Sequence, residues 1–466
     1  RAAYFECGEA FFQIGQVEEA VHYYEKYERM KGRNYANANK ESALELEYDE
    51  RLSKRRENLA YLNQLQLADR EAANLGKQFN TSDDDYIPTI SNDGQTLIFT
   101  RRNVKNGKED VFMNERNQKK EWSNSRGVAS INTGNNEGMA KFATHSRSFF
   151  FAGCHREDTK GGCDLYEARF RKGNISNVQQ LQGKINSEKW DSQPSVSCDN
   201  RMLFFSSIRD NGFGGADIYV SYRGPSGNWS EPENLGRQIN TPGDEEAPFI
   251  APDGKTLYFT SNGHPGQGEG DIYMSRKTGN LWSEPINLGP AINSTGKELG
   301  FFVDGDGKSA YFSSSRFGGE GGLDIYHIEL PEEHRPELTA QMEGFVIDAD
   351  TKAPIQTAIK VGTGNEKWDL FTDEEGWFYM CVPGNKAYSF QVDVDGYEYF
   401  VEAVFVDQDA ADGKTSFYLE LQPKKTYLPK SIKTQIEIKR EQFFFDFDSD
   451  ALSDDAKIKL NKVVDL

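Results

Sequence analysis

The fold is indicated by the stretch Asp253-Gly254-Lys255-Thr256-Leu257-Tyr258-Phe259-Thr260, which is followed by a glycine-rich loop and by Asp271-Ile272-Tyr273. Closely similar stretches occupy 93–100 and 306–313, and an Asp before an apolar and an aromatic residue recurs along the chain. Successive copies of this Asp lie 54, 53, 54 and 53 residues apart, at Asp110, Asp164, Asp217, Asp271 and Asp324. A regular period of this length is typical of propellers and solenoids. We therefore expect a repeat architecture here.

A second recurring phrase indicates how the repeats close. Asn234-Leu235-Gly236 and Asn287-Leu288-Gly289 each end a unit, whereas the fifth unit runs from Tyr326 into a linker without such a phrase. An extra copy, Asn74-Leu75-Gly76, stands before the first unit. If strand 74–80 joins the fifth unit, no sheet edge is left open. The pattern predicts a closed five-bladed β-propeller over 74–330; a six-bladed ring would need a further blade, which we do not find.

This closure also predicts where the neighbouring segments leave the ring. The helices before residue 74 and the segment after Tyr326 should emerge next to each other, beside the fifth blade. A closing strand that belongs to the fifth unit places both chain ends of the ring in the same blade.

The residue types of the repeat suit a blade. Leu257, Tyr258 and Phe259 form an apolar run, as expected for a central strand that is covered on both faces. Asp side chains commonly accept hydrogen bonds from backbone amides in loops. We expect the Asp before the apolar and aromatic pair to bind the glycine-rich loop in this way. Because this Asp recurs in every unit, whereas an active site needs only one, we predict a structural role for it and no catalytic residue.

Charge and hydropathy narrow the classes of function. The 466 residues carry a formal net charge of -20 at a sequence pI of about 4.9. Such a field repels phosphate backbones, so we expect no nucleic-acid partner. No stretch approaches the roughly 18 apolar residues of a membrane span. The chain opens on Arg1 and stops at Leu466 within an expected first helix, so we expect a portion of a longer protein, in which a missing targeting signal is uninformative.

The cysteines leave one pairing open. Cys154 and Cys163 bracket the glycine-rich loop of the second unit and could face each other across a hairpin. A disulfide and two free thiols are equally compatible with this spacing. We expect the remaining cysteines to be small buried side chains in three different segments, at Cys7, Cys198 and Cys381.

Acidic clusters raise the question of Ca²⁺, which takes carboxylate oxygens. The clusters are Asp83-Asp84-Asp85, Asp244-Glu245-Glu246 and the pair Asp304 and Asp306. None has the full spacing of an EF-hand, so we interpret them as turn residues. The six histidines show no metal-ligand spacing. We expect neither a metal nor a cofactor.

Residues 1–73 are predicted to be helical, since they contain no Pro and are rich in helix-forming residues. Small residues at Gly8 and Ala20 would let two antiparallel helices approach, with Phe11 and Tyr24 beside the contact. This spacing resembles a tetratricopeptide repeat. Such a segment can form a peptide-binding groove, or it can pack on the next domain; one visible repeat favours packing.

The repeats of 74–330 resemble the TolB-like, or PD40, family of propellers. The resemblance rests on Asp-Gly-x-x-Leu-[Tyr/Phe]-Phe followed by Gly-Gly-x-Asp-Ile-Tyr. It implies a propeller that is used mainly for protein contacts. No Gly-x-Ser-x-Gly nucleophile elbow occurs in the chain, so the sequence offers no hydrolase nucleophile of that kind.

Two further segments follow. Short alternating runs between Gly and Pro turns over 341–422 predict a small antiparallel sandwich and resemble the carboxypeptidase regulatory-like, transthyretin-like domain. The segment 436–466, with its run from Phe443 to Phe447 and a helix that Ser453 could cap, resembles the start of an OmpA-C-like peptidoglycan-binding domain. Its peptidoglycan-contacting residues are unknown, because that family's ligand residues lie further along.

The expected fold class is therefore multidomain: an N-terminal α-helical repeat, a five-bladed β-propeller, a transthyretin-like β-sandwich and a truncated α/β OmpA-like domain. This order resembles OmpA-family proteins of the type IX secretion system. The resemblance implies a non-enzymatic, outer-membrane-associated periplasmic scaffold. The partners it implies are other type IX components, among them a PorP/SprF-type barrel, and peptidoglycan.

A second reading stays open. The propeller face could bind glycans or peptides, with aromatic side chains as stacking surfaces, at Trp190, Trp229 and Trp282. Because Trp-Ser-Glu-Pro recurs with the blade period, structural packing is the favoured interpretation of these rings.

Overall fold

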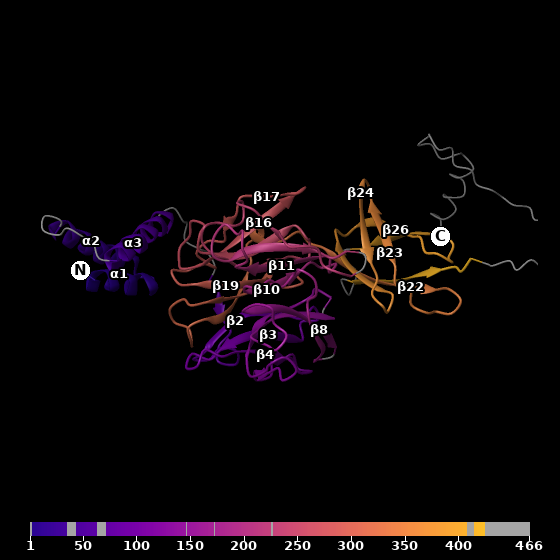
Figure 1. Cartoon of the computed structure of the whole chain (residues 1–466), viewed down its shortest axis with the longest axis horizontal. Coiled ribbons are helices and arrows are strands. Elements are labelled where there is room, and N and C mark those ends of the chain that lie inside the picture. The colour runs from indigo at the N-terminus through magenta and orange to yellow at the C-terminus, as the bar shows by residue number, and fades with distance from the viewer. Residues whose placement is uncertain are drawn as a thin grey trace, which may run out of the picture. The chain divides into compact units, whose positions relative to one another are not determined.

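The computed structural model describes residues 2–34, 43–62, 71–145, 147–171, 173–224, 227–407 and 414–424. The chain divides into a compact unit, Arg1–Pro423, and a second unit, Lys424–Leu466. The predicted OmpA-like start at 436–466 lies outside the described residues. Figure 1 follows the compact unit from its helices to its last strands, and in these described ranges the chain is mostly β-sheet with few helices.

A helical segment precedes the sheets. Its helices are α1 (Ala2–Gln13), α2 (Val17–Asn34) and α3 (Ala43–Leu62). A Cβ built on Gly8 would lie 2.6 Å from the ring of Tyr24, so the close approach of α1 and α2 requires glycine there. Phe5, which is fully buried, stacks on Tyr48 of α3 with ring centroids 4.5 Å apart. None of the helices in the described part of the chain combines the length and apolarity needed to cross a membrane.

Described residues 71–330 form five antiparallel sheets, one for each copy of the repeat. Their strands, sheet by sheet, are β2 (Asp84–Ile90), β3 (Thr96–Arg102), β4 (Glu109–Glu115) and β5 (Arg126–Gly127); β6 (Asn136–Phe142), β7 (Ser148–Cys154), β8 (Cys163–Arg171) and β9 (Asn174–Gln180); β10 (Asp191–Val196), β11 (Met202–Ser207), β12 (Asp217–Tyr222) and β13 (Glu233–Asn234); β14 (Glu245–Ile250), β15 (Thr256–Ser261), β16 (Asp271–Thr278), β17 (Leu281–Trp282) and β18 (Ile286–Asn287); β19 (Glu298–Val303), β20 (Ser309–Ser314), β21 (Asp324–Glu329) and β1 (Ala73–Asn74).

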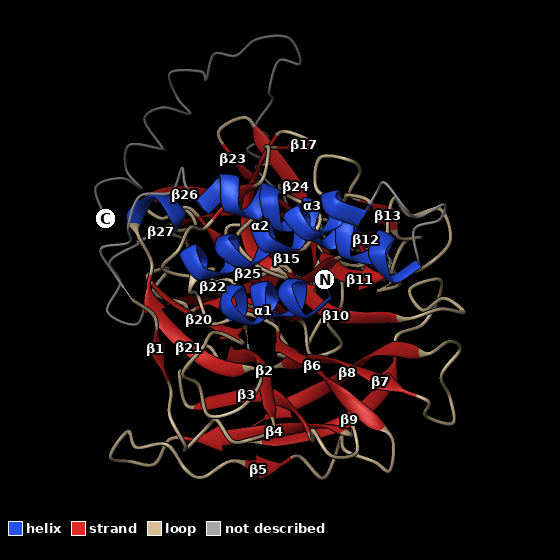
Figure 2. Ribbon diagram, turned by 90° about the vertical axis from the view of Figure 1, so that its left-hand side faces the viewer, coloured by secondary structure: helices blue, strands red, loops and turns tan. Residues whose placement is uncertain are grey.

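The first strands of these sheets contact one another in a closed cycle, which we call the ring. β2 contacts β6, β6 contacts β10, β10 contacts β14, β14 contacts β19, and β19 contacts β2. In Figure 2 the outermost strands of successive sheets, β5, β9, β13, β17 and β1, lie around the periphery. The first strands therefore line the centre, where side chains from all the sheets meet.

The strand before the first sheet completes the last one. β1 pairs antiparallel with β21, with Ala73 opposite His327 and Asn74 opposite Tyr326. This strand is shorter than the predicted strand 74–80, because the chain turns at Gly76, whose φ is +75°. Asn80 then reaches back, and its side chain both accepts from the amide of Ile325 and donates to its carbonyl.

Each first strand carries a β-bulge at the same place. The register against the second strand shifts between Tyr86 and Thr89 in the first sheet and at the matching positions of the other sheets. The bulged residues all have positive φ: Ile87, Met139, Gln193, Ala247 and Gly300. Positive φ is costly for a β-branched residue such as Ile87, so packing around the ring centre must hold this conformation.

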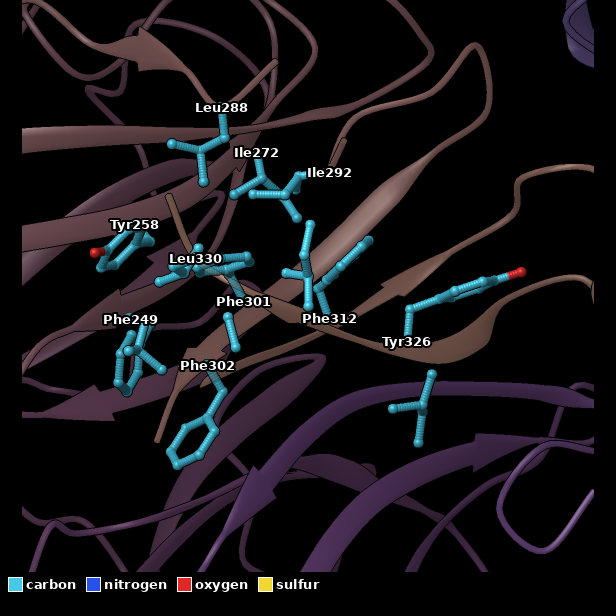
Figure 3. Packing of buried hydrophobic residues seen from close by; sticks show 14 of the residues in the cluster. Phe249, Tyr258, Ile272, Leu288, Ile292, Phe301, Phe302, Phe312, Tyr326 and Leu330 are labelled. Carbon is cyan, nitrogen blue, oxygen red and sulfur yellow. The ribbon is translucent and has the colours of Figure 1, made fainter. Parts of the chain in front are cut away.

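The apolar run of the repeat is covered on both faces, as its sequence predicts. Leu257, Tyr258 and Phe259 are fully buried. Tyr258 packs into a cluster formed by the fourth, fifth and first sheets, whereas Leu257 and Phe259 pack against the third sheet. Figure 3 shows the first of these clusters, in which the rings of Phe301 and Phe312 of the fifth sheet lie with their centroids 6.1 Å apart. The main cores of the ring thus lie between neighbouring sheets.

A segment of two facing sheets follows the ring, and we call it the sandwich. Its strands are β22 (Ala340–Asp348), β23 (Ala358–Thr363), β24 (Glu366–Phe371), β25 (Trp377–Val382), β26 (Lys386–Val392), β27 (Phe400–Val406) and β28 (Lys414–Leu421). One sheet has the order β25-β22-β28 and the other β24-β23-β26-β27. The expectation of a purely antiparallel sandwich is wrong, because β22 and β28 run parallel. The chain crosses from one sheet to the other before β28, which allows this pairing.

The helices and the sandwich contact opposite ends of the ring strands. On the helical side, the Asn58 amide donates to the Gly268 carbonyl, and Arg55 pairs with Glu269, both in the loop between β15 and β16. On the other side, the sandwich meets the turns between first and second strands, where Gln341 bonds Asn92. The chain does enter and leave the ring side by side in the fifth sheet, as predicted, because Ala73 lies opposite His327. The helices themselves, however, pack on the fourth sheet's loop, at the opposite end of the ring strands from the sandwich.

Candidate functional site

The recurrent Asp of the repeat mostly binds the loop before it. Gln267 and Gly268 donate their amides to Asp271, and Glu320 and Gly321 do so to Asp324. Asp164 and Asp217 accept loop amides in the same way. Asp110 differs, because it accepts from the Lys108 ammonium at 3.0 Å. These carboxylates act as loop clamps in four of the described sheets.

The structure contains a second layer of polar side chains, which the sequence analysis did not predict. At the start of each first strand a buried carboxylate accepts from the hydroxyl and the amide of a Thr or Ser four residues earlier. These carboxylates are Asp85, Glu137, Asp191, Glu245 and Glu298. The signal that could have found them is the pattern Asn-[Thr/Ser]-x-x-x-[Asp/Glu], which recurs in every unit.

Burial and ion pairing act against each other in this layer. Arg101 lies 2.6 Å from Asp85, yet burial outweighs the guanidinium and raises the pKa of Asp85 to about 6. Burial raises the pKa of Glu298 to about 7, against the opposing effect of Arg316 at 3.8 Å. The ring therefore contains acids that change charge near neutral pH.

A cavity of about 500 Å³ opens at the end of the ring where the first strands begin, and we call it the mouth cavity. Polar groups line it: the Lys297 ammonium pairs with Glu246 at 2.7 Å, and Gln193 and Trp190 are also in the lining. The lining further includes Leu299, from an apolar cluster that also holds Tyr86, Ile87 and Ala247. The cavity can therefore take a small polar ligand by hydrogen bonding.

A buried lysine lies further along the centre of the ring. Lys141 is 3% exposed, and its Nζ lies 3.4 Å from the carbonyl oxygen of Phe301. The ammonium also lies over the rings of Phe249 and Phe302, at 5.4 and 5.8 Å from their centroids. Burial lowers its pKa to about 7. Sequence reading missed this group because a lone lysine in a strand carries no signal.

The three tryptophans considered as stacking surfaces lie in different surroundings. Trp190 lines the mouth cavity and is half-buried. Trp229 is 9% exposed and packs in the core between the second and third sheets. Trp282 packs edge-on against Phe204 with ring centroids 6.1 Å apart. The fold therefore brings one of these rings to a cavity and uses the other two for packing.

The cysteines fall into pairs that sequence reading resolved only in part. Cys154 and Cys163 face each other across β7 and β8 and are disulfide-bonded. Cys198 and Cys381 form a second disulfide, between the ring and the sandwich. The expectation that Cys7, Cys198 and Cys381 are small buried side chains in separate segments is wrong for Cys7, which is exposed. Cys198 is buried as expected, but the fold brings it together with Cys381 over a long sequence separation.

The acidic clusters considered for Ca²⁺ bond protein groups instead. Asp84 pairs with Arg102, the amide of Val104 donates to Asp83, and Asp244 bonds Asn262. Asp306 accepts the amides of its own turn. In the described ranges, no group of three or more His, Cys, Asp or Glu side chains is arranged to hold a metal ion.

No protein-family model matches the chain, and no curated protein does. Among solved structures it is similar to an α-L-arabinofuranosidase from Lactobacillus brevis, at 11% identity and a TM-score of 0.38, covering 55% of this chain and 93% of that one. It is also similar to TolB from Acinetobacter baumannii, at 14% identity and a TM-score of 0.32, covering 64% of this chain and 65% of that one.

Proposed function

We propose that the chain is a non-enzymatic scaffold whose ring holds two binding segments at a fixed separation. The observation that carries this proposal is the attachment at both ends of the ring strands. Arg55 reaches Glu269 at 3.4 Å on the helical side, and Cys198 is bonded to Cys381 on the sandwich side. A body joined in this way transmits force between partners, which is the task of a tether.

The same proposal includes an assignment of each segment to a domain type. We take the ring as a closed five-bladed propeller of the PD40 type and the helices as a tetratricopeptide-like unit. The sandwich would be a transthyretin-like, carboxypeptidase regulatory-like domain, and 436–466 the start of an OmpA-C-like domain. In this order the protein resembles PorE, a peptidoglycan-associated component of the type IX secretion system.

The two disulfides support a periplasmic location, because disulfides persist in oxidising compartments. Association with the outer membrane is part of the same proposal. The partners in this proposal are other type IX components, among them a PorP/SprF-type barrel, bound by the ring and the helices. Peptidoglycan would be bound by the OmpA-like region. No nucleic acid and no cofactor take part.

Sedimentation with isolated sacculi tests the tether. The full-length protein should co-sediment with sacculi, and a variant truncated after residue 423, which lacks the OmpA-like region, should stay in the supernatant. The deletion variant should still capture its protein partners from detergent-solubilised envelopes. Retention of the deletion variant on sacculi would contradict the proposal.

A second candidate function is glycan or peptide binding by the ring, and the mouth cavity favours it through Trp190. A glycan array probed with residues 74–330 would test it only if this part folds alone, so the whole chain is the better probe. Binding that is lost in Trp190→Ala and kept in Trp282→Ala would establish this function in place of a pure scaffold.

A further inference from the structure

We propose that a cleft between the ring and the sandwich binds a short acidic peptide segment of a partner protein. The cleft, which we call the junction cavity, has a volume of about 430 Å³. This size lies within the range of about 300–1,000 Å³ that is usual for ligand pockets. It lies at the opposite end of the ring strands from the mouth cavity. The inference goes beyond the proposed function and does not depend on attachment to peptidoglycan.

The walls of the junction cavity are fixed in place. The Cys198–Cys381 disulfide joins the turn between β10 and β11 to the end of β25. Arg171 forms an ion pair with Glu375 at 2.9 Å, and the Arg147 guanidinium lies 4.0 Å from the centroid of the Trp377 ring. Because ring and sandwich are fastened on both sides of the cleft, little ordering is needed when a ligand enters.

The side chains of two arginines of the ring wall form no hydrogen bond or ion pair within the described part of the chain. The Nε of Arg201 is buried without a hydrogen bond, and the exposed side chain of Arg169 forms no hydrogen bond or ion pair with the described residues. The neighbouring Arg223, by contrast, donates to the carbonyl of Gly227 and lies near Glu167. The backbone amide of Arg201 is held by Asp199, which fixes its turn. The cavity thus presents unused guanidinium groups from an ordered surface.

The remaining lining selects the chemical class of the ligand. Guanidinium groups bind carboxylates through two parallel hydrogen bonds. The side chains of Asn177 and Gln179 offer amide donors and acceptors that match a peptide backbone, and Asn200 Oδ1 is buried without a donor. The sandwich wall carries Glu374 and its neighbours, which would repel two charges concentrated on one phosphate more than the single charge on each of two separate peptide carboxylates. An acidic peptide therefore fits better than a phosphate.

Fluorescence anisotropy with the whole chain tests this inference. The probe is a fluorescein-labelled hexapeptide that contains two adjacent glutamates, and its matched control peptide carries glutamines instead. We expect the acidic peptide to bind at least tenfold more tightly than the control peptide. Arg169→Gln combined with Arg201→Gln should weaken binding at least tenfold, whereas the exposed Arg126→Gln, outside the cavity, should leave it unchanged.

A single variant, a competitor and an independent readout complete this experiment. Arg169→Gln alone, at an exposed position, should weaken binding several-fold even if Arg201 also supports its turn. Equal binding of both peptides, or binding unaffected by the arginine variants in a folded protein, would overturn the inference. Competition by inorganic phosphate at the same concentration as a free acidic peptide would overturn the assignment to carboxylates. Sacculus binding should not change in these variants, which separates this site from the tether.

Discussion

Cys198, in the turn between β10 and β11, is bonded to Cys381 at the end of β25, 183 residues further along the chain. The disulfide lies beside Trp377 and Tyr379 in a small buried cluster. It joins the ring to a segment that has a hydrophobic core of its own, Ala340–Leu421. The relative position of ring and sandwich therefore depends on one covalent bond, on the aromatic rings packed beside it and on polar contacts such as the Arg171–Glu375 ion pair.

Removal of this bond should uncouple the two segments. Loop-closure entropy assigns about 5 kcal/mol to a cross-link over this separation. The matched control, the Cys154–Cys163 disulfide, spans 9 residues and should be worth about 3 kcal/mol by the same relation. We expect Cys198→Ser with Cys381→Ser to lower the melting temperature more than Cys154→Ser with Cys163→Ser. Calorimetry should resolve separate transitions for ring and sandwich in the first variant; one unchanged transition would count against this coupling.

Glu298 should make the stability of the ring depend on pH. Its pKa is raised in the folded protein from 4.5 to about 7, chiefly by burial. Its contribution to stability is therefore complete below pH 4.5 and is lost as the pH rises through 7. Glu298→Gln should match the wild type at pH 4.5 and become more stable than it by up to about 3 kcal/mol at pH 8. Urea unfolding at both pH values measures this difference, and a difference that does not grow with pH would refute the assignment.

Lys141 should destabilise the ring at neutral and acidic pH. Burial lowers its pKa from 10.5 to about 7 in the folded protein. The neutral amine is tolerated above pH 10.5, and stability falls as the pH drops through 7. Lys141→Met should therefore be stabilising by at most about 5 kcal/mol below pH 7, with a gain that shrinks toward pH 10. Thermal unfolding between pH 6 and 9.5 tests this; a destabilised variant throughout would show that the amine is needed.

Asn80 should control the closure of the ring. Its side chain makes hydrogen bonds to both the backbone amide and the carbonyl of Ile325, 245 residues further along the chain. Asn293 makes the same two hydrogen bonds to Ile272, from which it is separated by only 21 residues. Each substitution to Ala should cost about 2–3 kcal/mol, because it leaves buried backbone groups unpaired.

The two asparagine variants should differ in dynamics. Only Asn80→Ala should also speed hydrogen exchange of the β21 amides, since β1 is held by two residue pairs. Equal exchange in β21 for Asn80→Ala and Asn293→Ala would mean that β1 does not close the ring.

The sequence by itself determined the repeat and its local chemistry. The period of the Asp residues marked each sheet, and the run Leu257 to Phe259 is covered on both faces as predicted. Gly8 and Tyr24 were placed at the contact of α1 and α2. These features depend on residue type and spacing within one unit, so short-range pattern is enough to find them. The buried carboxylates also have a pattern, in Asn-[Thr/Ser]-x-x-x-[Asp/Glu], which becomes visible once their hydrogen bonds are known.

The tertiary structure alone decided how distant parts meet. The Cys198–Cys381 bond, the position of Lys141 among rings of other sheets and the free guanidinium groups of the junction cavity have no local signal. The helices and the sandwich lie at opposite ends of the ring strands because side chains far apart in sequence, such as Arg55 and Glu269, find each other there. Contacts of this kind depend on how the units pack around the ring, and a sequence period does not encode that packing.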